Sequence, residues 1–126
     1  MSNNKKNYLP YLLGAALLLG GCAELIEKDL SKKNVGLIAP SNNVAIPDSL
    51  ALSFAWDSVD GATQYTLMVA TPSFDSIVQL VADTIVTRTS LTLPALNTTG
   101  QYQWRVMASN NTSSTPLSAP WNFLLQ

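Results

Sequence analysis

Two kinds of hydrophobic pattern divide the chain. Near the N-terminus, the apolar residues run together in one uncharged stretch from Leu12 to Leu19. After Val35, apolar and polar residues alternate in short runs, which are separated by Pro, Asn, Asp, Ser, Thr and Gly. Strict alternation places one set of side chains on one face of an extended chain, so the second part predicts half-buried β-strands.

The alternation is clearest in three stretches, 50–56, 64–69 and 101–108. Weaker alternation predicts further strands at 78–82, 85–87, 91–93 and 121–125. Two short runs, 37–39 and 44–46, are each closed by a proline, which suits strands at a sheet edge. No stretch after Val35 has the spacing of an amphipathic helix. Seven or eight strands in about 90 residues predict an all-β sandwich.

The N-terminal apolar run is typical of an export signal. Lys5 and Lys6 precede it as a positive region. The run is too short to span a membrane, which needs about 20 apolar residues, but it has the length of a signal-peptide core. It is therefore a targeting segment and takes no part in the predicted fold.

Leu19-Gly20-Gly21-Cys22 resembles the lipobox of bacterial lipoproteins, in which small residues precede a cysteine. The resemblance implies removal of residues 1–21 and acylation of Cys22, which anchors the chain to a membrane by lipid. The alternative is an ordinary signal peptide that ends near the only cysteine by chance. Ala23, which stands where a retention signal would have aspartate, favours the outer membrane, on either its periplasmic or its cell-surface face.

Residues 22–35 have the composition of a tether. The stretch 23–34 holds six charged side chains of mixed sign and no aromatic residue, so it has too little apolar surface to fold alone. Fully extended at about 3.3 Å per residue, it would hold the domain up to roughly 40 Å from the lipid. The domain itself is expected at 36–126.

Three segments resemble strands B, C and F of fibronectin type III domains. They are Phe54-Ala55-Trp56, the run 61–67 and the run 102–110. The resemblance covers 37–126 and implies a fibronectin type III-like sandwich with Trp56 and Tyr65 in its core. The opening 37–40 and the Phe-x-Trp also resemble the N-terminal domain of starch-utilisation-type outer-membrane lipoproteins. Those proteins carry further glycan-binding domains that this chain lacks.

Composition argues against catalysis. The chain has no histidine, one cysteine, seven Lys plus Arg and eight Asp plus Glu. It therefore lacks the commonest general base and metal ligand, any internal disulfide and any basic field for nucleic acid. We expect no enzyme activity, no cofactor, no metal site and no nucleic-acid partner.

Seven aromatic residues occupy strand positions whose side chains face inward, so we expect them in the hydrophobic core. They are Phe54, Trp56, Tyr65, Tyr102, Trp104, Trp121 and Phe123. Only Phe74, in the loop 71–74, lies outside the predicted strands. Its side chain either covers the end of the sandwich as a lid or serves as a platform for a ligand. Glycan binding usually needs exposed rings, so a glycan-binding accessory role in polysaccharide uptake is the alternative function.

Four tripeptides share the order aspartate, hydroxyl residue, aliphatic residue. They begin at Asp48, Asp57, Asp75 and Asp83. The order resembles the O-glycosylation motif of secreted proteins in the Gram-negative group that carries starch-utilisation-type lipoproteins. The candidate acceptors are Ser49, Ser58, Ser76 and Thr84. The alternative is that polar turns leading into strands produce this order by themselves.

Met68, Met107 and Leu124 have the outward parity on strands that are neighbours in the type III topology. Together with Ala70 they would form an apolar strip, either a docking surface or scattered exposed residues. The sequence therefore predicts a lipoprotein of the outer membrane that presents one binding or scaffold module, with an envelope protein as its partner.

Overall fold

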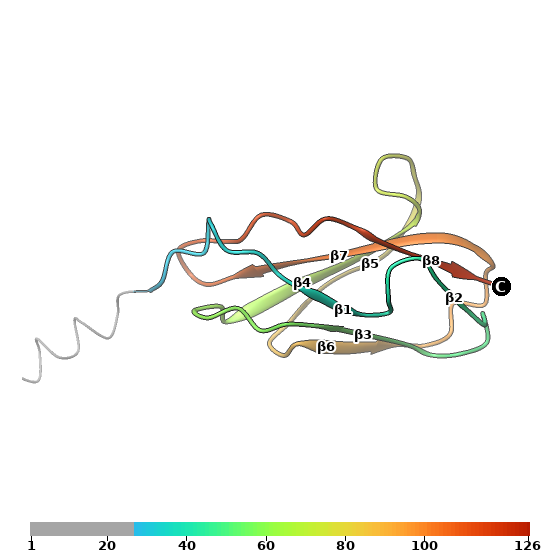
Figure 1. Cartoon of the computed structure of the whole chain (residues 1–126), viewed down its shortest axis with the longest axis horizontal. Helices are drawn as coiled ribbons and strands as arrows, with labels where there is room; N and C mark the ends of the chain where they lie inside the picture. The colour runs from blue at the N-terminus through green and yellow to red at the C-terminus, as the bar shows by residue number, and fades with distance from the viewer. Residues whose placement is uncertain (1–26) are drawn as a thin grey trace, which may run out of the picture.

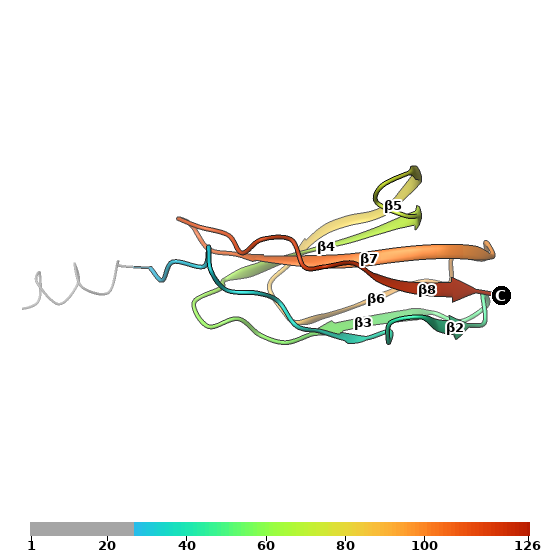
Figure 2. The same ribbon diagram turned by 45° about the horizontal axis from the view of Figure 1, so that its top comes forward.

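The computed structural model describes residues 27–126, which form eight strands and no helix. The strands make a three-stranded sheet in the order β1-β3-β6 and a five-stranded sheet in the order β2-β8-β7-β4-β5. Figure 2 shows the two sheets as layers that face each other along the long axis of the molecule. The predicted all-β sandwich is confirmed. The export segment and Cys22 lie outside the described residues.

Most strands lie where the alternation places them. Their bounds are β1 (Leu37–Ala39), β2 (Val44–Ile46), β3 (Leu52–Trp56), β4 (Gln64–Pro72), β5 (Ile77–Val86), β6 (Ser90–Leu93), β7 (Gly100–Ser109) and β8 (Trp121–Leu125). The two short strands β1 and β2 are edge strands, as expected, and β2 pairs in parallel with β8.

One boundary prediction is wrong. The separate strands expected at 78–82 and 85–87 are a single strand, β5, that pairs with β4 along its length. Asp83 and Thr84 look like a break in the sequence, but they pair with Met68 and Leu67. Polar residues are tolerated here because β5 is the outermost strand of its sheet and is open to solvent.

Aromatic side chains from both sheets meet in the core, as the inward parity predicts. The Phe54 ring lies 5.2 Å from the Trp104 ring, centroid to centroid, and the Tyr102 ring stacks on the Phe123 ring at the same distance. Of the seven aromatic residues expected inside, six are buried, and Trp121 is half-buried against the edge of Trp104. Such pairs add specific geometry to the burial of large apolar surfaces.

The described part of the expected tether does not behave as one. Leu30 is completely buried and Val35 is 5% exposed, and both belong to the hydrophobic core. The segment has too few apolar residues to fold alone, but these two side chains suffice to dock it onto a formed sandwich. Residues 27–35, called the docked segment below, therefore belong to the domain, and 22–26 lie outside the described residues.

Candidate functional site

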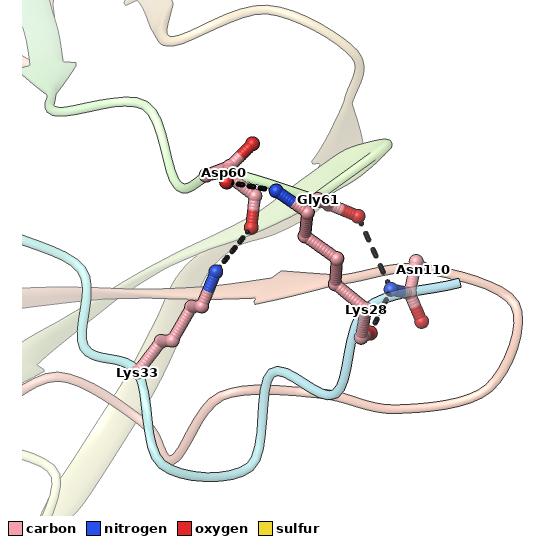
Figure 3. A network of polar contacts seen from close by, with 5 residues as sticks. All are labelled: Lys28, Lys33, Asp60, Gly61 and Asn110. Atoms are coloured by element: carbon pink, nitrogen blue, oxygen red, sulfur yellow. Dashed lines mark hydrogen bonds and ion pairs between the residues drawn. The ribbon is translucent and has the colours of Figure 1, made fainter. Parts of the chain in front are cut away.

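The docked segment is held by a polar network at one end of the sandwich (Figure 3). The Lys28 ammonium forms an ion pair with the Asp60 carboxylate, and the Lys33 Nζ donates to the Asp60 carbonyl at 2.9 Å. The Asn110 side-chain amide donates both to the Lys28 carbonyl, at 2.8 Å, and to the Gly61 carbonyl, at 3.1 Å. Asn110 thus joins the segment to two loops of the domain.

Further hydrogen bonds run along the same segment. The Leu30 N–H donates to the Ser113 hydroxyl at 3.0 Å, and the Asn111 N–H donates to the Glu27 carboxylate at 2.9 Å. The Asn110 side-chain oxygen accepts from the Ser113 N–H at 2.9 Å and so shapes the loop that receives the segment. The contacts extend from the first described residue to the buried Leu30.

Charge contributes less to this docking than burial does. The Lys28 ammonium lowers the pKa of Asp60 by its hydrogen bond and then by its charge. Both partners are exposed to solvent, however, and exposed ion pairs contribute little to stability. The free energy of docking therefore comes mainly from Leu30 and Val35 and from the hydrogen bonds of Asn110.

The expected apolar strip on the outer face of the five-stranded sheet is not continuous. Leu124 pairs with Gln101, whereas Met68 pairs with Arg105, four residues further along β7 and so about 13 Å away. Leu124 instead lines a shallow pocket of about 180 Å³ with amide side chains around it. Ala70, the fourth expected member, is completely buried.

Ile85 takes the place that Leu124 was expected to fill. Ile85 and Met107 lie on either side of Thr66 in one row across β5, β4 and β7. Met68 lies in the next row, diagonal to both, at a separation that long side chains can bridge. Ile85 is 61% exposed and the two methionines are half-buried. We call Met68, Ile85 and Met107 the outer-face patch.

Phe74 lies on this same sheet face, not over the end of the sandwich. The Arg105 guanidinium lies 3.9 Å from the centroid of its ring, and the Phe74 N–H donates to the Gln103 side-chain oxygen at 2.9 Å. Both partners project outward from β7. The tip of the β4–β5 hairpin therefore folds onto the outer face, next to the row that contains Ala70 and Gln103.

Sequence reasoning missed the exposed apolar residues of the β4–β5 hairpin. Regular alternation would put Val78, Leu80 and Ala82 on one face, but Val69 pairs with Ala82 and Ala70 with Leu80. Val81 is therefore an extra residue, a bulge that puts Leu80 on the opposite face from Ala82. Val78 is a second extra residue, because Gln79 pairs with Thr71 and Ile77 pairs with Pro72. Leu80, on the outer face, is 45% exposed, and Val78, at the second bulge, is 84% exposed.

The candidate glycosylation acceptors fall into two classes. Ser49, Ser58 and Ser76 are exposed and lie outside the strands, where a modifying enzyme could reach them. Thr84 is half-buried in β5 opposite Leu67, which points into the core. Modification at these positions stays a prediction.

Other kinds of site find little support in residues 27–126. No group of three or more metal-binding side chains occurs there, and no helix there has the length and apolarity to cross a membrane. Within the same range Phe74 and Trp121 are half-buried and the remaining aromatic rings are buried. A sugar ring would find no fully exposed aromatic face among them.

No family model and no curated protein matches the chain. Among solved structures, it is similar to a Fn3-like protein from Clostridium thermocellum, with 26% identity, 72% of this chain and 86% of that chain covered, and a TM-score of 0.50. It is also similar to the fibronectin type-III domain of human fibronectin type III domain containing protein 3. There the identity is 14%, the coverage is 80% of this chain and 91% of that one, and the TM-score is 0.53. The fold is therefore fibronectin type III-like, a fold of binding and scaffolding modules.

Proposed function

We propose that the protein is a lipid-anchored module of the bacterial outer membrane that binds an envelope protein through the outer face and free edge of its five-stranded sheet. The export signal and the lipobox-like sequence that ends at Cys22 support the anchor. The outer-face patch, next to an unpaired strand edge, carries the binding role.

The partner that fits this surface is an extended, largely uncharged strand of another protein. β5 ends its sheet, so one side of its backbone has no partner strand in the described structure. Its ten residues include one charge, Asp83, and no proline or lysine. Edge strands are commonly protected by charged residues, proline or bulges. From Ala82 to Val86 the pairing of β5 with β4 is regular and Asp83 is the one such residue, so this part of the edge can accept an added strand. Outward apolar side chains of that strand would lie beside Ile85, on the face that also holds Met68.

A site-specific crosslink in the native envelope tests the contact. A photoreactive residue at Ile85 should give one crosslinked product, whose protein is identified by mass spectrometry. Ile38, 50% exposed on the edge of the other sheet, is the matched control and should give none. Equal products from both positions, or none from Ile85, would reject the surface.

The identified partner then allows a quantitative test. Ile85→Lys should weaken its binding in calorimetry at least tenfold, and Ile38→Lys should leave it within twofold. Met68→Lys combined with Met107→Lys should abolish co-purification of the partner without lowering the melting temperature. Unchanged affinity in Ile85→Lys would contradict the proposed site.

The anchor is tested separately. The intact mass of the protein from its native host should show the loss of residues 1–21 and the addition of lipid, and Cys22→Ser should release the chain from the membrane fraction. A mature chain without lipid would reject the anchor and leave the binding surface untouched.

A further inference from the structure

We infer that the docked segment fixes the orientation of the domain on the membrane. The end formed by loops 57–63 and 110–113 faces the lipid, and the end that holds the C-terminus faces away. The inference rests on the proposed acylation of Cys22 and adds to it a membrane-facing surface and an upper limit on the distance between that surface and the lipid.

The length of the connection is set by where docking begins. Glu27 already accepts a hydrogen bond from the Asn111 N–H, and only four residues separate it from Cys22. Five Cα–Cα steps span at most about 18 Å, compared with the roughly 40 Å of a fully extended tether. The first contact of the domain is therefore kept close to the lipid headgroups.

Docking persists because its release exposes apolar surface. To lengthen the connection, the chain would have to withdraw Leu30 from the core and break the hydrogen bonds of Asn110 and Ser113. Terminal segments detach from a domain most easily when none of their side chains is buried. Leu30 is completely buried, so detachment of this segment costs free energy. The segment thus acts as part of the domain and not as a flexible linker.

The fold places the two ends of the domain far apart. The docked segment and the loops that receive it lie at one end of the long axis, and the C-terminus lies at the other (Figure 1). At that distal end the Gln126 carbonyl accepts from the Asp48 N–H, and the Asp48 carbonyl accepts from the Asn97 N–H. The β4–β5 hairpin projects from the half of the molecule nearer the C-terminus.

Charge does not supply an alternative source of orientation. The segment and the loop 57–63 that receives it hold three lysines, Lys28, Lys32 and Lys33, against four acidic residues, Glu27, Asp29, Asp57 and Asp60, so their net charge is −1. A surface with little net charge is not drawn to anionic lipid. The orientation should therefore be the same on neutral and on anionic vesicles.

The experiment uses the full acylated chain in phosphatidylcholine vesicles that carry a headgroup-attached energy acceptor. A donor dye is attached at Asn111→Cys, at the proximal end, or at Thr99→Cys, in the loop at the distal end. Cys22 does not react because its thiol is acylated. Transfer from position 111 should exceed transfer from position 99, and the difference should persist when phosphatidylglycerol is added.

Two variants test the role of docking. Insertion of ten Gly/Ser residues between Cys22 and Glu27 keeps every contact of the domain but adds about 18 Å of average reach. It should lower transfer at position 111 and reduce the difference between the two positions. Leu30→Asp should do the same by undocking, whereas Leu117→Asp, on an exposed leucine, should change nothing.

The outcomes separate the two proposals. Equal transfer at both positions on an acylated protein, or no change after the insertion, would overturn the fixed orientation. A protein whose mass lacks lipid and that does not float with the vesicles would instead overturn the proposed anchor. If Leu30→Asp fails to fold, the insertion variant alone tests the fixed orientation, because the insertion changes no residue of the core.

Discussion

Truncation of Leu30 to alanine should destabilise the whole domain, although this residue precedes every strand. Its side chain is completely buried and packs in the same cluster as the residues of both sheets. Leucine-to-alanine changes at such sites cost about 2–5 kcal/mol, of which part is the cavity left behind. Because the segment can undock locally, we expect a value near the lower end, about 2–3 kcal/mol.

Urea denaturation followed by tryptophan fluorescence measures the difference directly, since the core contains Trp56 and Trp104. A loss of about 2 kcal/mol corresponds to roughly 8–16 °C in melting temperature for a domain of this size. Leu117→Ala, at an exposed loop position, is the control and should stay within about 0.5 kcal/mol of wild type. If both variants were equally stable, the segment would be a tether after all and its burial would have no energetic weight.

Three further changes probe the same end of the sandwich. Gly61→Ala should destabilise by more than about 1 kcal/mol, because Gly61 has φ +90° and a Cβ there would lie 2.8 Å from the Lys28 Cβ. Gly100→Ala, with φ +138° but open space around it, should cost less in the same urea titration, and equal costs would contradict the close approach. Asn110→Ala should lower the unfolding free energy by about 1–3 kcal/mol, seen as a lower urea midpoint, because it leaves carbonyl groups without a donor. Asp60, whose pKa is lowered by Lys28, favours folding above its ordinary pKa of 3.8 and loses that contribution as the pH falls below it. An NMR titration should find the Asp60 midpoint below 3.8 and should find it raised in Lys28→Ala, and an unchanged midpoint would count against the ion pair.

The sandwich could be predicted because its core is encoded by local alternation. On β3, β4 and β7 the inward-facing residues are large and apolar, as at Phe54, Leu67 and Trp104. The alternation in these three strands is uninterrupted around those residues. Parity along one strand then determines which face each side chain takes. No knowledge of the partner strand is needed, so the sequence alone suffices.

The surfaces were harder to predict because they depend on contacts between distant residues. The parity of Leu80 is set by the bulge at Val81, and Val78 is itself a second bulge residue; both bulges are properties of the pairing of β5 with β4 and not of β5 alone. Docking of Leu30 likewise depends on loops that follow it by many residues, such as the one that holds Ser113. A charged, apolar-poor segment is correctly judged unable to fold alone, but it can still pack onto a surface that other residues provide.

The position of the docked segment also determines how the protein would respond to mechanical load. If Cys22 carries lipid and a partner binds the β5 edge, as proposed, a pull between the two would enter the described domain through Glu27 and reach Leu30 before any strand. The contacts of residues 27–35 would yield first, one after another, and would release about 30 Å of chain while both sheets stay paired. The nine residues would thus extend under force and dock again when the tension falls, while the sandwich stays folded.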